Sequence, residues 1–136
     1  MVRSVPLLLL SLATTISLPT ARHSSAAPVD GGSAPFHLRL VKSEPAKDSA
    51  VTIAPKAIKL WFSEDVTVAV SSITLEAAGG TAVAMSKARN EGPDATLLLA
   101  DVTGALAPGS YVVKWRAASR DGHPVRGEFS FSVAKP

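Results

Sequence analysis

One short segment near the end of this chain of 136 residues combines side chains that bind metals, and it reads Ser119-Arg120-Asp121-Gly122-His123-Pro124. Gly122 permits a sharp backbone turn, and Pro124 biases His123 toward an extended conformation. Asp121 and His123 can then point to the same side, with one oxygen donor and one nitrogen donor close together. Mixed donors of this kind suit Cu(II), which also heads the affinity order of the divalent first-row ions.

Two ligands are too few for tight binding, so further donors have to come from elsewhere in the chain. His37 is a third ligand if the fold brings the start of the first predicted strand beside the Asp121 turn. Glu64 is a fourth oxygen donor, or an acceptor that orients a histidine. Each also has an ordinary interpretation, because Asp-Gly is a common turn pair and the other two suit an exposed strand end.

Composition excludes several other kinds of site. The chain has no cysteine, which rules out disulfides, thiolate zinc sites and a cysteine nucleophile. The pairs Gly31-Gly32 and Gly79-Gly80 do not belong to a G-x-G-x-x-G motif between a strand and a helix, which dinucleotide binding would need. No G-x-S-x-G turn marks a catalytic serine. A glycosidase-type pair of carboxylates stays open, since nothing selects which two acids would face each other. We therefore predict no enzyme, with neither catalytic residues nor an organic cofactor.

The N-terminal stretch is typical of a secretory signal peptide. A short basic start at Met1–Arg3 precedes an apolar run over Val5–Leu18 that is too short and too polar to span a bilayer. Small residues at Ser24-Ser25-Ala26 suit cleavage. The predicted organisation is a signal peptide over 1–26, a flexible lead over 27–35 and one folded domain over 36–136.

The mature chain would then be periplasmic or secreted, with no membrane insertion. Removal of Arg3 and Arg22 with the signal lowers the formal charge from +3 to +1. The mature part has no run of Lys or Arg interleaved with aromatic residues, which argues against nucleic acid as a partner. Nothing in the pattern demands association, so we expect a monomer.

From Phe36 onward, short runs alternate between apolar and polar residues, which is typical of half-buried strands. About seven strands at turn-punctuated intervals, with no sustained helical period, predict an all-β fold, an antiparallel β-sandwich. The β-rich runs are Leu38–Leu40, Ile58–Phe62, Val66–Val70, Ile73–Leu75, Thr81–Met85, Ala95–Ala100, Tyr111–Ala117 and Phe129–Val133. The predicted core is Leu38, Leu40, Ile58, Leu60, Phe62, Leu75, Leu97, Leu99, Tyr111, Val113, Trp115, Phe129, Phe131 and Val133.

Several of these segments together resemble the CopC/PcoC family of periplasmic copper-binding proteins. The resemblance runs over nearly the whole predicted domain, and the combination of segments is far more specific than any one of them. The matching segments are His37–Leu40, Ser43–Ala46 with Ser49, Ile58–Glu64, Leu106–Tyr111, Trp115–Ser119, Asp121–Val125 and Gly127–Phe131. The resemblance implies a sandwich of cupredoxin-like or immunoglobulin-like topology, in agreement with the strand count.

The same resemblance implies a function and a ligand set. Members of the family bind Cu(II) outside the cytoplasm, for copper resistance or for delivery to a membrane partner of the CopD type. The family's first copper-binding histidine falls on His37, its D-x-H pair falls on Asp121 and His123, and its accessory acidic residue falls on Glu64. Affinity for copper should fall as the pH drops through the range in which histidine takes up a proton, near ~6.5.

The sequence also departs from the family pattern in three respects. In tight-binding members the first histidine is the mature N-terminus and its α-amine is a ligand, whereas cleavage after Ala26 leaves further residues before His37. Leu38 stands where proline is common. Some members carry a methionine-rich loop for Cu(I), but Met85 is the only methionine after Met1, so no Cu(I) methionine site is expected.

Two other functions stay open beside copper binding. The first is an immunoglobulin-like interaction module in which the copper site is weak or lost along with the N-terminal amine. The second is a copper oxidase or oxygenase built on an N-terminal histidine, which requires the amine that cleavage after Ala26 would remove.

Overall fold

The computed structural model describes residues 37–135, so the predicted signal peptide and lead lie outside the described residues. This part of the chain contains nine strands and one short 3-10 helix, and it has no helix long and apolar enough to cross a membrane. The elements are β1 (Leu40–Glu44), β2 (Ala50–Val51), β3 (Ala57–Phe62), η1 (Val68–Val70), β4 (Ser72–Ala77), β5 (Ala82–Val83), β6 (Arg89–Glu91), β7 (Asp94–Asp101), β8 (Gly109–Ala118) and β9 (Pro124–Val133).

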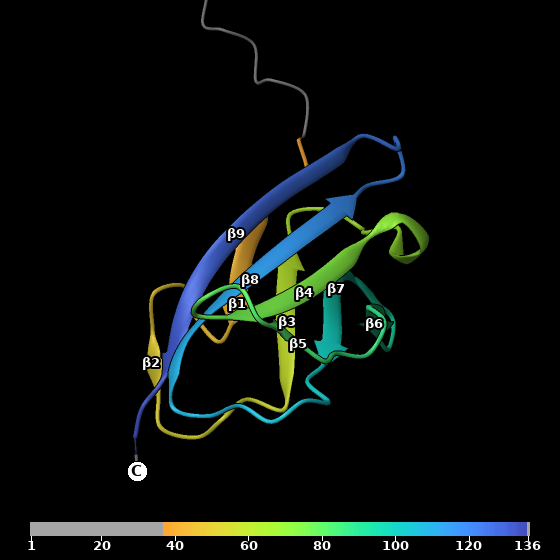
Figure 1. The fold of residues 1–136 in the computed structure, drawn as a ribbon. Helices are drawn as coiled ribbons and strands as arrows, with labels where there is room; N and C mark the ends of the chain where they lie inside the picture. Colours follow the sequence, from red (N-terminus) through yellow and green to blue (C-terminus); the bar gives the residue numbers. More distant parts are fainter. Residues whose placement is uncertain (1–36, 136) are drawn as a thin grey trace, which may run out of the picture. The chain divides into compact units, whose positions relative to one another are not determined.

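The strands form two sheets that pack as a β-sandwich, which confirms the predicted fold class. One sheet has the order β1-β3-β7-β6 and the other has the order β2-β9-β8-β4-β5. In Figure 1 the strands β9, β8 and β4 run in front of β3 and β7. All pairs are antiparallel except β2 with β9, which is parallel. The short strands β2 and β6 account for the difference between these nine strands and the predicted count of about seven.

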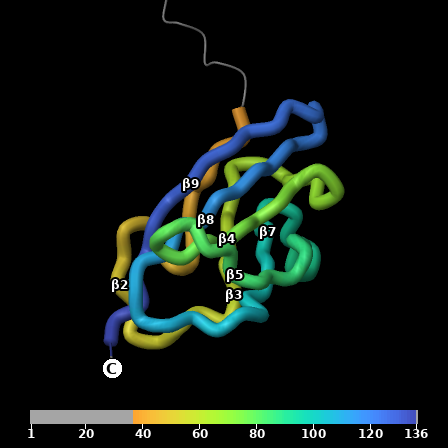
Figure 2. Tube along the Cα trace, viewed as in Figure 1, coloured from red at the N-terminus to blue at the C-terminus, as the bar shows by residue number. Residues whose placement is uncertain are grey.

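The longest ladder joins β8 to β9 and carries the turn that sequence analysis singled out. Its register runs from Gly109 opposite Val133 to Ala118 opposite Pro124. The turn that follows Ala118 therefore lies at the far end of the ladder from the last residues of β9. Figure 2 shows this turn at the end of the sandwich opposite the C-terminus.

The core between the sheets matches the predicted set closely. All of the predicted core residues are buried except Leu40 and Trp115, which are half-buried. The Trp115 ring meets Phe62 edge-on at a centroid distance of 5.2 Å. The Tyr111 ring stacks on Phe131 at 5.5 Å, and its hydroxyl donates a hydrogen bond of 2.6 Å to a backbone carbonyl. Aromatic pairs of this geometry stabilise a core by about 0.5–1.5 kcal/mol beyond their buried area.

The apolar run of β7 presents a different face to this core from the one predicted. Leu98 and Ala100 join the cluster between the sheets, opposite Leu60 and Ile58 of β3. Leu97 and its second neighbour Leu99 are also buried, but they lie outside that cluster. Four consecutive apolar residues have no period of two, so the pattern alone could not choose the inward face.

The β-rich run Val66–Val70 does not form a strand, which corrects the sequence-based expectation. The backbone N–H of Val66 donates to Ala95 in one sheet, and that of Thr67 donates to Ala118 in the other, both at 2.8 Å. The chain thus crosses between the sheets and turns through η1. Backbone pairing with both sheets in succession overrides the strand propensity of valine and threonine.

Candidate metal centre

The candidate site is the turn Ser119–His123, which joins β8 to β9. Gly122 adopts a positive φ of 78°, a conformation that strongly favours glycine, and its N–H donates to the carbonyl of Ser119 at 3.0 Å. A backbone hydrogen bond thus closes the turn before β9 begins at Pro124. This closure places the side chains of Asp121 and His123 on a short, hydrogen-bonded loop.

Within this turn the two predicted ligands lie in contact. The Asp121 Oδ2 atom is 3.2 Å from His123 Nδ1. The other carboxylate oxygen, Oδ1, accepts hydrogen bonds from the Ser119 hydroxyl at 2.6 Å and from the His123 backbone N–H at 3.1 Å. Both oxygens therefore have partners, and the carboxylate is held in one orientation.

These hydrogen bonds also set the charge of the turn. They lower the pKa of Asp121 below its ordinary value, chiefly through the Ser119 hydroxyl and then through the backbone and ring of His123. The carboxylate is therefore ionised at neutral pH. The side chains of Asp121 and His123 are 55% and 84% exposed, so an ion or a partner can reach both from solvent.

Ser119 has a role in this turn that was not predicted from the sequence. It is buried, and its hydroxyl makes the shortest hydrogen bond to Asp121. The signal was present as the spacing Ser-x-Asp at the end of a strand, a pattern in which short polar side chains bond to each other and to the nearby backbone. Ser119 therefore orients Asp121.

The other two predicted ligands lie at the same end of the sandwich. His37 is exposed and precedes Arg39, whose backbone N–H donates to the Ser63 hydroxyl at 3.0 Å and whose carbonyl accepts from the Ser63 N–H at 2.9 Å. Glu64 follows Ser63 and is half-buried. Thr67, four residues after Ser63, donates a backbone hydrogen bond to the carbonyl of Ala118, the last residue before the turn.

The structure nevertheless brings only two of the four predicted residues into contact. Asp121 and His123 touch, whereas residues 37–135 contain no group of three His, Cys, Asp or Glu side chains arranged to hold a metal ion. His37 and Glu64 are neighbours of the turn by topology. Binding by all four would require side chains to move toward the Asp121 carboxylate.

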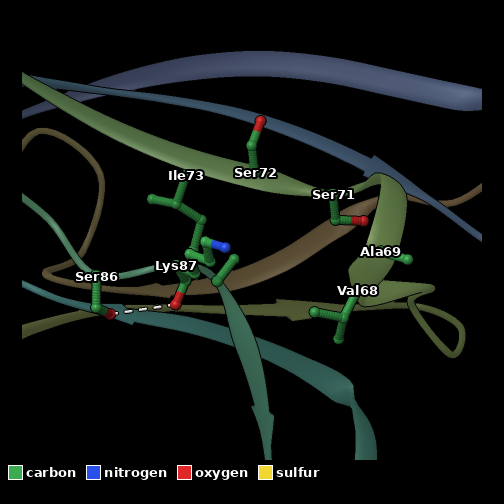
Figure 3. Close-up of a pocket in the computed structure, with 8 residues that line it drawn as sticks. Val68, Ala69, Ser71, Ser72, Ile73, Ser86 and Lys87 are labelled. Atoms are coloured by element: carbon green, nitrogen blue, oxygen red, sulfur yellow. Dashed lines mark hydrogen bonds between the residues drawn. The ribbon is translucent and has the colours of Figure 1, made fainter.

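Two surface cavities within the described residues lie away from these side chains. The larger, of about 430 Å³, is lined by residues of η1, the start of β4 and the segment before β6. Figure 3 shows serine side chains and Lys87 around it, with the Ser86 hydroxyl bonded to the Lys87 carbonyl at 3.1 Å. The second, of about 370 Å³, lies along β1 and is lined by Lys42 and Lys47 among others. Neither lining includes a histidine or a carboxylate, so neither offers metal ligands.

The fold and the site together define a class of protein: an all-β sandwich with an exposed Asp-Gly-His turn at one end. The family model of the CopC domain matches residues 40–134. The chain belongs to the CopC family. It is also 35% identical over 128 residues to a copper resistance protein C of Xanthomonas campestris pv. juglandis, a match that covers 90% of this chain and 95% of that protein.

Solved structures agree with this assignment. The crystal structure of CopC from Methylosinus trichosporium OB3b matches with a TM-score of 0.67 and 38% identity, over 72% of this chain and 94% of that one. PcoC, a methionine-rich copper resistance protein from Escherichia coli, matches with a TM-score of 0.63 and 36% identity, over 72% of this chain and 99% of that one. The fold and the family are therefore established by both sequence and structure.

Proposed function

We propose that this chain is an extracytoplasmic copper-binding protein of copper resistance or homeostasis, with one Cu(II) site at the β8–β9 turn. The observation that carries the proposal is the Asp121 carboxylate, ionised and oriented by Ser119, in contact with the exposed imidazole of His123. The ligands are His123, Asp121 and His37, with Glu64 as an accessory oxygen or an acceptor that orients a histidine.

The contact between Asp121 and His123 suits metal binding because either imidazole tautomer leaves one ring nitrogen with a free lone pair. When Nδ1 carries the proton and donates to the Asp121 carboxylate, the lone pair of Nε2 is free to bind copper. When Nε2 carries the proton instead, Nδ1 and the Asp121 Oδ2 atom, 3.2 Å apart, would offer an ion one nitrogen and one oxygen donor without any rotation of the carboxylate. Imidazole and carboxylate together are a donor set that Cu(II) accepts in tetragonal geometry.

We expect Cu(II) rather than Cu(I) because, within residues 37–135, no sulfur ligand lies at this turn. The chain has no cysteine, and Met85 pairs in an isolated bridge with Val102, whose N–H bonds to Lys56 just before β3. The candidate site lies near the other end of β3, which is the end that Ser63 follows. Since Cu(I) prefers several thioether or thiolate donors, we expect no Cu(I) methionine site.

The N-terminal organisation bears on affinity. We propose that the signal peptide 1–26 is removed, that 27–35 is a lead and that 36–136 is the domain, so that the mature chain begins at Ala27 in the periplasm or outside the cell. His37 would then bind through its ring alone, without an α-amine. Copper bound in this way is more labile, which favours sequestration with exchange, or delivery to a membrane partner of the CopD type.

The mature protein is proposed to act as a monomer and without catalysis. The exposed position of His123 supports transfer, because a partner can approach the metal directly. Mass spectrometry of the secreted protein would identify the cleavage site, and copper transfer to CopD-type membrane vesicles would distinguish delivery from storage.

The deciding experiment is electron paramagnetic resonance of the secreted protein with one equivalent of Cu(II) and a competing chelator. We expect a tetragonal nitrogen and oxygen signal that resists the chelator and disappears in His123→Ala. The melting temperature of that variant should be unchanged because the side chain is largely exposed. The number of coupled nitrogens reports whether His37, and any terminal amine, takes part.

A matched control is Lys56→Ala, an exposed change at the opposite end of β3. It should leave the copper signal intact. A spectrum that shows only chelator-bound copper in the wild-type protein would contradict the proposal, and would favour an interaction module that kept the fold without the metal.

A further inference from the structure

Two arginines face each other on the outer surface of the five-stranded sheet. Arg116 of β8 and Arg126 of β9 are register partners, and both are exposed. Their neighbours Trp115, Ala117 and Val125 point into the core side of the same strands. The two guanidinium groups therefore leave the sheet on the solvent side, one directly opposite the other.

This arrangement is unfavourable for the fold by itself. Directly opposed like charges destabilise an antiparallel pair, because the side chains leave the sheet only about 4.5–5.5 Å apart. Among residues 37–135 no carboxylate lies within ion-pair distance of either guanidinium. On the other side of β8, the register partner of Arg116 is Ser72 of β4, which carries no charge.

The other charged residues of this face are one lysine and two glutamates, Lys114, Glu76 and Glu128. Lys114 donates a 2.7 Å hydrogen bond to Glu76, and it also lies opposite Glu128 in the ladder. These two carboxylates raise the pKa of Lys114, Glu76 foremost. The middle of this face therefore carries more acidic than basic groups, and the end where Arg116 and Arg126 lie carries two basic groups without an ion-pair partner.

The basic end lies next to the candidate metal turn. The next pair on the same face of the ladder is Ala118, which is buried, opposite the exposed Pro124, and the turn begins there. Arg120, within the turn, is also exposed. A molecule bound to the two guanidinium groups would therefore lie next to the turn that carries Asp121 and His123.

We propose that Arg116 and Arg126 form a docking surface for a carboxylate-rich segment of a partner protein. Two adjacent planar guanidinium groups match carboxylates, which they bind through paired hydrogen bonds. An anionic bilayer fits less well, because it would extend over the whole face, Glu76 and Glu128 included, whereas a short acidic segment can contact the two arginines alone. The docking surface goes beyond the proposed copper site and does not depend on bound metal.

The test is a titration of the metal-free protein with a short peptide of alternating Asp and Glu, followed by ¹⁵N NMR at low ionic strength. Shifts should be confined to the ends of β8 and β9 and to the turn between them. Arg116→Gln and Arg126→Gln should each weaken binding by about fivefold or more, since each removes one charge-assisted contact. Lys56→Gln, with the same change in charge at the other end of the sandwich, should have no effect.

Stability provides an independent readout. Relief of the like-charge contact should leave the melting temperature of Arg126→Gln unchanged or higher, while binding of the acidic peptide falls. A lowered melting temperature would show that the arginine serves the fold, and would overturn the proposal.

Three other outcomes would also overturn it. These are an absence of shifts at β8 and β9, equally tight binding of inorganic phosphate at the same residues, and tighter binding of phosphatidylglycerol vesicles than of the peptide. Copper binding by Arg126→Gln, measured in parallel, keeps this test separate from that of the copper site.

Discussion

The indole of Trp115 lies against Gly127, its register partner in β9, so closely that an added Cβ would come within 2.5 Å of the ring atom Cζ2. The same ring meets Phe62 of the opposite sheet edge-on. The strand that leads away from the candidate turn therefore needs a residue without a side chain at this point. The glycine lets a bulky ring lie between the sheets near the end that carries the site.

Replacement of this glycine tests the packing. Gly127→Ala should lower the free energy of unfolding by about 1–3 kcal/mol, because the new methyl group has to displace the indole or the backbone. Urea denaturation measures the change. Ser130→Ala, on the exposed face of the same strand, is the control and should alter stability by less than about 0.5 kcal/mol. An unchanged Gly127→Ala variant would contradict the close contact.

Removal of the Ser119 hydroxyl tests the orientation of Asp121. Ser119→Ala should weaken Cu(II) binding by about tenfold, because groups that orient a metal ligand typically contribute about 10–100-fold in affinity. The hydroxyl now holds Oδ1 at 2.6 Å, and without it the carboxylate can rotate. Competition with a chelator gives the affinity. Ser110→Ala, exposed at the start of β8, should bind like the wild type, and equal affinity in both variants would refute the role of Ser119.

The stability of the protein should decline in acid. The Arg89 guanidinium, which holds Asp101 through two hydrogen bonds of 2.8 and 3.0 Å, lowers the pKa of that carboxyl, and the Thr96 hydroxyl lowers the pKa of Asp94. A lowered pKa in the folded state stabilises the fold above the unfolded aspartate value of ~3.9, and this contribution is lost as the pH falls through the folded pKa.

The free energy of unfolding should therefore decrease as the pH is lowered below ~4. Asp101→Asn should show a shallower decrease in the same window, since one of the responsible carboxylates is gone. Denaturation at a series of pH values measures both slopes. Equal slopes for the variant and the wild type would show that the contact between Arg89 and Asp101 contributes nothing to the pH dependence of stability.

The single methionine of the domain should be irrelevant to copper. Met85→Leu should bind Cu(II) as tightly as the wild type, because Met85 lies at the opposite end of β3 from the candidate turn. Under reducing conditions neither protein should retain Cu(I) against a competing ligand such as bicinchoninate. Retention by the wild type and loss in Met85→Leu would reveal a Cu(I) site and contradict the assignment.

Much of the fold could be predicted because alternation in the strands reports burial directly. Ile58, Leu60 and Phe62 alternate with polar or half-exposed residues, and all three are buried in the structure. The same rule fails where alternation is missing, as in the apolar run of β7, where neighbours on both faces are buried. It also fails for Val66–Val70, where hydrogen bonds to two different sheets decide the path.

The sequence by itself determined the chemistry that this protein can offer: a carboxylate and an imidazole around one glycine, no sulfur cluster, and strands that have to pack as a sandwich. Only the tertiary structure decided that the Ser119 hydroxyl orients Asp121, that Arg116 stands opposite Arg126, and that His37 shares an end with the turn. The physical reason is that local spacing constrains turns and faces, whereas strand register, which brings distant residues together, depends on the packing of the whole core.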